Sequence, residues 1–320
     1  MASQPSIQPE NNTVARKRSL TGSFLFWFKI VRPHSLFASA CPVLIGWKIS
    51  LAAGSFHFST ALLTLLCAMS LQILSNLVND YYDFLRGADK KGRKGFQRPL
   101  AEGLLCEQEM KNAALTALAA CIALGGWLVV IGGWPILLIG LTSLLFAWLY
   151  TATDYSLSYL GIADIFVLLY YGIFACWGTV WLQQAAGLPL WANWQHISFQ
   201  LQGYSLQTVL FGGGVCGLLS MCVLAANNVR DIEDDRAVNK RTFAVRFGKT
   251  AALVGYALIV VLMPVSAWLA YGFSPAVFII LPGAFLLYKM LTSSGAAYNR
   301  CLMLAGIFNA VYVVLAWFSL

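Results

Sequence analysis

Long apolar stretches recur along the whole chain, and they constrain its fold more than any other feature of the sequence. Hydrophobic residues make up 59% of the 320 residues and charged residues only 11%, a composition outside the range of ordinary soluble domains. A helix of about 20 apolar residues crosses the roughly 30 Å hydrocarbon core of a bilayer. We therefore expect an all-α polytopic membrane protein with about nine transmembrane helices. The nine stretches are 34–53, 59–79, 110–131, 134–152, 161–182, 206–227, 250–270, 275–292 and 301–319.

The two ends of the chain and the spacing of its motifs suggest the domain organisation. Residues 1–21 are polar and basic and contain no apolar run, so we expect a disordered tail rather than a cleaved signal peptide. Residues 22–320 then form a single transmembrane domain. Similar acidic clusters end the second and the sixth apolar stretch, four helices apart. This repetition predicts two four-helix halves of similar plan, with a ninth helix that closes the bundle.

Basic residues fall almost entirely in alternate loops. The loops near 55–58, 132–135, 183–203 and 271–275 contain no Lys, Arg, Asp or Glu, and only Lys48 lies towards that side. Because Lys and Arg collect in cytoplasmic loops, we expect an integral protein of the cytoplasmic cell membrane. Its N-terminus and its charged loops would face the cytoplasm and its C-terminus the outside. The same bias, together with attraction to anionic lipid headgroups, explains the net charge of +8 without nucleic acid as a partner.

Acids and amides alternate in the two clusters. On a helix, residues four apart lie on one face, so Asn79 shares a face with Asp83, and Asn227 shares one with Asp231 and Asp235. Each cluster can therefore direct its oxygens at one point. Such oxygens suit Mg²⁺, which is held by one or two carboxylates, waters and the phosphate oxygens of a substrate. The pattern predicts a diphosphate bound between the two clusters.

Two other interpretations account for acids at helix ends. Acidic helix ends can simply be solvated at the membrane surface, but solvation requires neither single helical faces nor a repeat in the two halves. An ion-coupled secondary transporter also carries intramembrane carboxylates, which it buries near the bilayer midplane. Here the acids crowd one end of the helices, and Asp164 lies just inside the start of the fifth stretch, where the helix dipole favours a carboxylate. The transporter remains the alternative of a different class.

The motifs resemble those of a known family, the UbiA-type intramembrane aromatic prenyltransferases. The run from Asn79 to Asp89 is similar to that family's first Asp-rich motif, and the run from Asn227 to Asp235 is similar to its second. The resemblance covers nearly the whole chain from about residue 30, and the paired motifs are far more specific than either alone. Further matching segments are Lys240–Gly248, Arg32-Pro33, Arg98-Pro99-Leu100 with Gly103, and Tyr150-Thr151.

Within the family, the two motifs are most similar to those of enzymes that prenylate 1,4-dihydroxy-2-naphthoate in menaquinone (vitamin K2) biosynthesis. The resemblance implies transfer from an allylic polyprenyl diphosphate to that acceptor, with decarboxylation to demethylmenaquinol. Asn239 stands where that branch usually has Gly. The 98–100 loop is also similar to other branches, so a 4-hydroxybenzoate polyprenyltransferase or another UbiA-type enzyme is the alternative.

The resemblance also implies roles for individual residues in an Mg²⁺-dependent reaction. Independently of the resemblance, the sequence leads us to expect that the basic loops 85–103 and 237–249 cover one shared cavity and that Gly87 ends the second helix in a left-handed conformation. Tyr81, Tyr82 and Tyr150 could stabilise a carbocation, and Asp80 or Asp154 could deprotonate the acceptor. The implied catalytic residues are Asp80, Asp83, Asp231 and Asp235. The implied metal ligands are Asn79, Asp83, Asn227, Asp231 and Asp235. The implied substrate-binding residues are Arg32, Asp89, Lys90, Arg98, Tyr150, Arg236 and Lys240.

Overall fold

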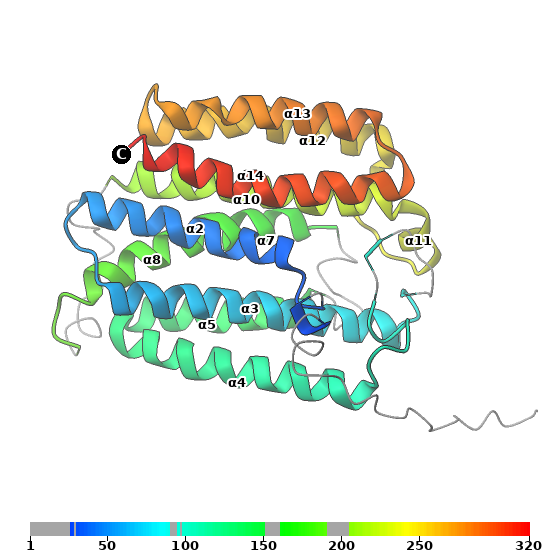
Figure 1. The fold of residues 1–320 in the computed structure, drawn as a ribbon, viewed down its shortest axis with the longest axis horizontal. Coiled ribbons are helices and arrows are strands. Elements are labelled where there is room, and N and C mark those ends of the chain that lie inside the picture. The colour runs from blue at the N-terminus through cyan, green and yellow to red at the C-terminus, as the bar shows by residue number, and fades with distance from the viewer. Residues whose placement is uncertain (1–25, 29, 90–94, 97, 151–160, 191–204) are drawn as a thin grey trace, which may run out of the picture.

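The computed structural model describes residues 26–28, 30–89, 95–96, 98–150, 161–190 and 205–320, and within these ranges it contains helices and no strand. The tail expected at 1–21 lies outside them. Figure 1 shows long, roughly parallel helices that run from one end of the molecule to the other. The main helices are α2 (Pro33–Ala52), α3 (Phe58–Leu85), α4 (Glu107–Gly132), α5 (Trp134–Leu149), α7 (Ala163–Leu168), α8 (Phe174–Ala185), α10 (Leu206–Arg230), α11 (Ile232–Ala237), α12 (Phe243–Tyr271), α13 (Ile280–Thr292) and α14 (Tyr298–Trp317).

Most of the apolar stretches form helices long enough to cross a bilayer. Among the described residues, eight helical segments meet the length and hydropathy of a membrane span, and α7 and α8 count as one of them because a π-helical turn at Leu169–Ile173 joins the two. The remaining apolar stretch forms α5, which has 16 residues and is shorter than the usual span of about 20. The expected integral membrane protein is confirmed, and the count of nine depends on α5.

Helices of the two halves pack side by side, and α14 closes the bundle. In the first half α3 packs against α2, α4 and α5, and in the second half α10 packs against α7, α8 and α12. The last helix, α14, lies against α2, α10 and α13, so it joins the start of the first half to the second (Figure 1). This arrangement places the ends of α3 and α10 at the same end of the bundle.

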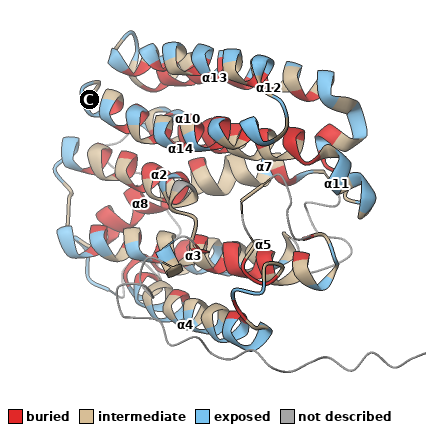
Figure 2. Cartoon of the chain, turned by 45° about the vertical axis from the view of Figure 1, so that its right-hand side comes forward, coloured by how far each residue is buried: buried red, intermediate tan, exposed pale blue. Residues whose placement is uncertain are grey.

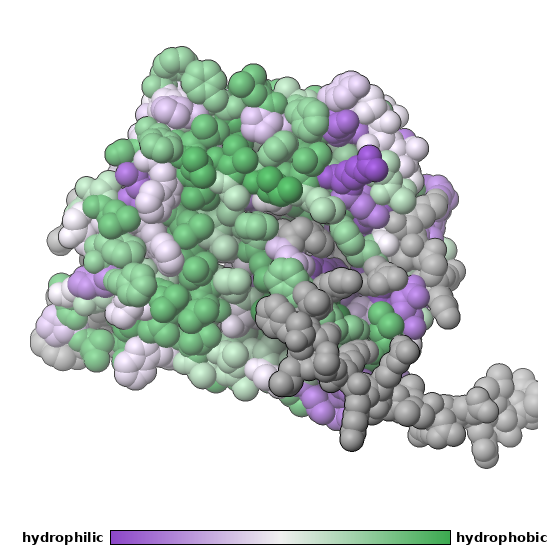
Figure 3. Space-filling model, viewed as in Figure 1, coloured by the Kyte–Doolittle hydropathy of each residue, from purple (hydrophilic) through white to green (hydrophobic). Residues whose placement is uncertain are grey.

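The main buried core centres on the second half and also includes α2 and the closing helix α14. It is formed by apolar residues of α2, α8, α10, α12, α13 and α14, whereas smaller clusters fill the space around α3 and α4. Figure 2 shows buried residues on the inward faces and exposed residues on the outward faces of the outer helices. Many outward-facing side chains are large and apolar, such as Leu258, Leu262 and Leu281. An outer surface of this kind suits lipid contact, and Figure 3 shows it as a mainly hydrophobic face.

Two helices approach unusually closely where the π-helical turn meets α10. A Cβ built on Gly172 would lie 2.8 Å from the carbonyl oxygen of Gly213 and 2.8 Å from the backbone of Gly217, so only glycine fits this crossing. In a membrane, helices associate through such close packing of small residues rather than through the hydrophobic effect. The contact sets the position of α7 and α8 beside α10, and therefore one wall of the interior.

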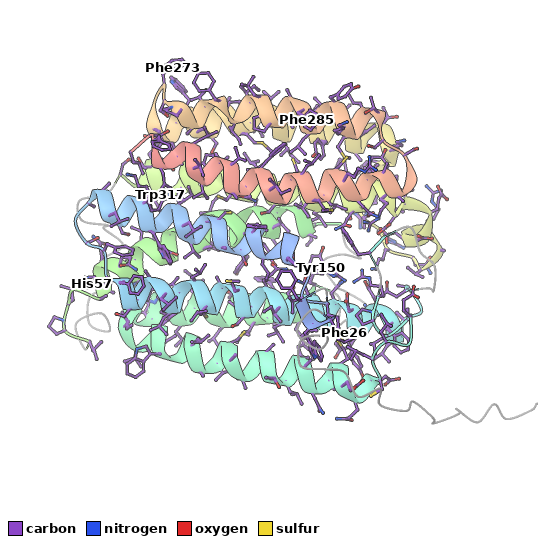
Figure 4. The ribbon with its side chains drawn as sticks, in the orientation of Figure 1. Phe26, His57, Tyr150, Phe273, Phe285 and Trp317 are labelled. Carbon is purple, nitrogen blue, oxygen red and sulfur yellow. The ribbon has the colours of Figure 1, made fainter. Side chains whose placement is uncertain are left out.

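Charged side chains gather at one end of the bundle. Among the described residues, the acidic and basic side chains lie at the end where α3 and α10 finish, except Lys48 near the end of α2. The most hydrophilic surface in Figure 3 lies at that right-hand end. His57 and Phe273 mark the opposite end, and Tyr150 lies on the charged side (Figure 4). The separation of charge expected from the loops is therefore present in the fold.

Candidate active site

A cavity of about 560 Å³ lies between the two halves of the bundle. Its walls come from α2, α3, α4, α5, α7, α8 and α10, and most of the lining is apolar. The polar part lies at the charged end. The five residues expected to bind metal all line it, namely Asn79, Asp83, Asn227, Asp231 and Asp235. Carboxylates and amides that lie far apart in the sequence thus face one chamber.

Arg98 is the centre of the charge network around the first cluster. Its Nη1 contacts Asp80, its Nη2 lies 3.8 Å from Asp83 Oδ2, and its Nε lies 3.2 Å from Asp89 Oδ1. Arg32 also contacts Asp80. These groups are largely buried, and a guanidinium can serve several carboxylates because its donors form a rigid fork.

Lys240 reaches the first cluster from the other half of the chain. Its Nζ lies 2.8 Å from Asp83 Oδ1, and both side chains are mostly buried. Because Asp83 lies in the last turn of α3 and Lys240 precedes α12, this contact ties the two halves together over the cavity. Arg32, Arg98 and Lys240 all line the cavity, so three of the expected diphosphate contacts converge there.

The turn after α3 holds Asp89 in place. Gly87 adopts φ +67°, which confirms the expected left-handed end of the helix and is a conformation that glycine accepts without strain. The backbone N–H groups of Ala88 and Asp89 both donate to the carbonyl oxygen of Asp83, at 2.9 and 3.3 Å. Asp80 and Asp89 do not line the cavity. They lie behind Arg98 and hold it against the chamber.

The residues of the second cluster do not lie on one continuous helix. Helix α10 ends at Arg230, Asp231 has non-helical φ −101° and ψ 13°, and Asp235 lies on the separate short helix α11. The prediction that Asn227, Asp231 and Asp235 share one helix is therefore wrong, because the chain turns at Asp231. All three still reach the cavity.

Arg230 holds the second cluster together, and the sequence reasoning missed it as a site residue. Its Nε and Nη2 lie 2.7 and 2.6 Å from the two oxygens of Asp231, and Nη2 also donates to Asn227 Oδ1 at 2.7 Å. Its Nη1 donates to Asn299 Oδ1 on α14 at 2.5 Å. The position of Arg230 inside the second motif was the available signal, but no local pattern points to Asn299.

Some expected substrate contacts lie elsewhere. Arg236 is 58% exposed, forms a surface pair with Glu233 at 3.6 Å and does not line the cavity. Lys90 and Asp154 lie outside the described residues. The second covering loop, expected at 237–249, contains a short helical segment, because Thr242 Oγ1 accepts from Val245 N at 3.4 Å and α12 begins at Phe243. Gly248 interrupts this helix with φ 84° and ψ 168°. The long regular part of α12 therefore starts after Gly248, close to the expected end of the loop.

Asn239 and Arg32 adopt left-handed backbone conformations near the site. Their φ angles are 58° and 55°, and they are the two described non-glycine residues with positive φ. Asn accepts this conformation better than most side chains, which gives a physical reason why Asn can stand at a position where the resemblance led us to expect Gly. A left-handed backbone conformation at Arg32 is unfavourable by about 1–2 kcal/mol. The ion pair of Arg32 with Asp80 offsets this free energy.

The aromatic residues at the cavity are mostly not those that the sequence suggested. Tyr150 lines the cavity as expected. Tyr81 and Tyr82 do not: their ring centroids lie 5.4 Å apart, and Tyr82 also packs against Trp148. The cavity is lined instead by aromatics of the α7–α8 span and its neighbours, namely Phe146, Phe166, Tyr170, Tyr171 and Phe174. The four-residue spacing of 166, 170 and 174 was the available signal.

The oxygen donors fit a hard cation shared with a ligand. Among the described residues no three His, Cys, Asp or Glu side chains converge closely enough to enclose a metal. Mg²⁺ does not require such a cage, because it is usually held by one or two carboxylates, waters and substrate phosphates. Asp83 and Asp235 line the cavity together with Asn79 and Asn227, so the donor set fits such a site.

Comparison with known proteins places the chain in a family. The model of the UbiA prenyltransferase family matches residues 39–318. The chain belongs to the UbiA prenyltransferase family. It is therefore a membrane prenyltransferase. The 1,4-dihydroxy-2-naphthoate octaprenyltransferase of Escherichia coli is 32% identical over 71% of this chain and 70% of its own length. The enzyme of the same name from Mycobacterium leprae is 31% identical over 78% and 81%.

Solved structures of the UbiA family share the fold. A UbiA homolog from Archaeoglobus fulgidus bound to DMAPP and Mg²⁺ has a TM-score of 0.58, covers 91% of this chain and 97% of its own, and is 16% identical. A UbiA homolog from Aeropyrum pernix has a TM-score of 0.63 at 13% identity, with 88% and 97% covered. At these identities the comparison shows the helical fold, and the chemistry of the site is argued from this UbiA-family chain itself.

Proposed function

We propose that this UbiA-family chain transfers a polyprenyl group from an allylic polyprenyl diphosphate to 1,4-dihydroxy-2-naphthoate. Diphosphate and CO₂ leave, and the product is demethylmenaquinol for menaquinone biosynthesis. The observation that carries the proposal is the single cavity in which the two acid-and-amide clusters meet three basic side chains beside an apolar wall. The relatives named as 1,4-dihydroxy-2-naphthoate octaprenyltransferases support the acceptor.

The basic residues at the charged end bind the diphosphate and stabilise it as it leaves. Breaking the allylic C–O bond leaves negative charge on the diphosphate, and preorganised cations stabilise that charge most in a site that excludes water. Arg98 and Lys240 are already oriented by Asp80, Asp83 and Asp89. Their positions therefore change little when the substrate binds, which keeps the reorganisation cost low.

The metal ligands proposed here are Asn79, Asp83, Asn227, Asp231 and Asp235. Bound Mg²⁺ would neutralise charge on the diphosphate oxygens. In the structure, Asp83 is paired with Lys240, and Asp231 with Arg230. We propose that Arg230 keeps Asp231 and Asn227 directed at the cavity, while Asp83 and Asp235 present their oxygens from opposite halves.

The apolar part of the cavity holds the prenyl chain. Its wall includes Leu71, Leu128, Val129 and Leu182, which suit an isoprenoid tail and exclude water from the reacting carbon. Tyr150 and Tyr170 line the cavity, and the faces of such rings can stabilise an allylic cation. The nucleophile is then the electron-rich ring carbon of the acceptor.

A product assay tests this proposal. Purified protein in detergent is supplied with Mg²⁺, a polyprenyl diphosphate and either 1,4-dihydroxy-2-naphthoate or 4-hydroxybenzoate, and products are identified by mass spectrometry. We expect a prenylated, decarboxylated naphthoquinol, no product in EDTA, and recovery when Mg²⁺ is restored. Product only from 4-hydroxybenzoate would move the chain to that branch. Activity that resists EDTA would contradict the metal role, and solute uptake without any prenylated product would favour the transporter.

We further propose that the charged end faces the cytoplasm of a cell whose cytoplasmic membrane holds the protein. The support is the concentration of basic side chains at that end, whereas Lys48 is the only described Lys or Arg at the other end. Single cysteines test it, because seven of the eight native ones are buried. In intact cells an impermeant maleimide should label Phe273→Cys, whose position is 86% exposed, and should label Glu233→Cys only after lysis. The reverse pattern would overturn the orientation.

A further inference from the structure

Gln72 and Asn76 form a polar patch inside the cavity, deeper than the acidic clusters. Both line the cavity and both are more than 90% buried. They lie on α3 on the same face as Asn79 and Asp83, because their positions are spaced at about one and two helical turns. At a rise of about 1.5 Å per residue, Gln72 is about 10 Å along the helix from Asn79. Neither Gln72 nor Asn76 takes part in the proposed binding of the metal, the diphosphate or the prenyl chain.

Hydrogen bonds determine which way both amides point. Asn76 Nδ2 donates to the backbone carbonyl of Val31 at 3.1 Å, and a carbonyl can only accept. The same nitrogen donates to Ser35 Oγ at 2.8 Å, and Ser35 in turn donates to the carbonyl of Arg32 at 2.9 Å. Asn76 Oδ1 must then be the acceptor, and it receives Gln72 Nε2 at 3.0 Å. The free atom of Gln72 is therefore its oxygen.

The side-chain oxygen of Gln72 is a hydrogen-bond acceptor that receives no hydrogen bond from the described residues. Gln72 Oε1 is buried and has no hydrogen-bond partner among the described residues, and no other described residue of the cavity wall keeps a buried side-chain atom in this state. A buried polar atom left unpaired is unfavourable, so a ligand that donates to it gains affinity. Gln72 therefore carries an unused acceptor at the wall of a cavity that it lines.

We propose that Gln72 Oε1 accepts a hydrogen bond from the 4-hydroxyl of the aromatic acceptor and thereby determines acceptor specificity. This inference rests on the proposed function, because it assigns a residue to the recognition of the acceptor proposed there. The 1-hydroxyl of 1,4-dihydroxy-2-naphthoate is adjacent to the carboxylate and forms an internal hydrogen bond with it. The 4-hydroxyl has no such neighbour, so it is the donor available to the protein.

Binding of two naphthoates tests the inference without requiring turnover. The probes are 1,4-dihydroxy-2-naphthoate and 1-hydroxy-2-naphthoate, which lacks the 4-hydroxyl, and affinities are measured anaerobically by calorimetry on purified protein in detergent. The wild type should prefer the dihydroxy compound by roughly 10- to 100-fold. Gln72→Leu should bind both equally. Its KM for the acceptor should rise while its KM for the prenyl diphosphate stays unchanged.

Gln183→Leu is the matched control. Gln183 is also a fully buried glutamine, but it lies at the opposite end, accepts from the His57 backbone N–H at 2.6 Å and does not line the cavity. This variant should keep the wild-type preference. If Gln72→Leu does not fold, Gln72→Met removes the same oxygen with a more adaptable side chain.

The outcomes separate the two proposals. A preference that persists in Gln72→Leu or Gln72→Met, or no preference in the wild type, overturns the role of Gln72. If Gln72→Leu or Gln72→Met still transfers the prenyl group to 1,4-dihydroxy-2-naphthoate with an unchanged KM for this acceptor, the role of Gln72 is also overturned. The proposed function is then unaffected. If the wild type prefers the dihydroxy compound and Gln72→Leu loses that preference, but the wild type transfers no prenyl group, binding of the 4-hydroxyl by Gln72 is supported and the proposed reaction is refuted.

Discussion

Asp83→Asn should reduce kcat/KM for prenyl transfer by at least about 100-fold, which corresponds to roughly 3 kcal/mol of lost transition-state stabilisation. Asp83 is buried, lies 2.8 Å from Lys240 and 3.8 Å from Arg98, and lines the cavity. The amide keeps the shape of the side chain but removes the charge that orients both cations and could bind Mg²⁺. Steady-state kinetics with increasing Mg²⁺ measure the effect, and excess metal should not restore the rate.

Asp234→Asn provides the matched comparison for this loss. Asp234 belongs to the second acidic cluster, but it is exposed on α11 and does not line the cavity. We expect its kcat/KM to stay within about twofold of wild type, because exposed charges contribute little. Near-normal turnover by Asp83→Asn, with the protein folded and stable in detergent, would refute a diphosphate site that depends on this carboxylate.

Arg98→Gln should be the most damaging change to a basic residue. Arg98 contacts Asp80, Asp83 and Asp89 while its side chain is only 11% exposed. Without it, buried carboxylates lose their partner, and breaking a buried ion pair costs about 3–5 kcal/mol. We expect both a lower thermal unfolding temperature in detergent and a loss of transfer of more than about 100-fold, with a raised KM for the prenyl diphosphate.

Arg236→Gln separates a specific contact from general basicity. The sequence placed Arg236 beside Arg98 among the residues expected to bind the diphosphate. In the structure, however, Arg236 lies on the surface next to Glu233. Its unfolding temperature and its KM for the prenyl diphosphate should both match wild type. Equal losses in Arg98→Gln and Arg236→Gln would mean that net positive charge at this end, rather than the contacts of Arg98, binds the substrate.

The sequence alone was sufficient for the class of fold and for the location of the two polar clusters. Apolar stretches of membrane-spanning length leave few alternatives to a helix, because a backbone in lipid must satisfy its own hydrogen bonds. The periodicity of α3 was enough to place Asn79 and Asp83 together, and Gly87 was a reliable sign of the helix end. These are local properties, so local patterns predict them.

Local patterns failed where the chain turns or where distant side chains meet. The break of α10 at Asp231 separates residues that a continuous helix would align. Tyr81 and Tyr82 pack away from the cavity, whereas Tyr170 and Tyr171 reach it because the close contact of Gly172 with α10 positions the α7–α8 span. Which face of a helix meets the interior depends on its neighbours, and an almost uniformly apolar helix has no polar stripe that marks that face.

Only the tertiary structure could choose among the charged and amide side chains. Arg98 and Arg236 both follow an acidic motif, but one is enclosed by carboxylates from α3 and the turn after it while the other extends into solvent. Arg230 meets Asn299, and Asn76 meets Ser35 and the carbonyl of Val31, across long intervals of sequence. The sequence by itself therefore determined that this is a helical membrane protein with two oxygen-rich clusters. The packing of the helices decided which side chains form the site, because burial and hydrogen-bond direction arise only when distant segments lie side by side.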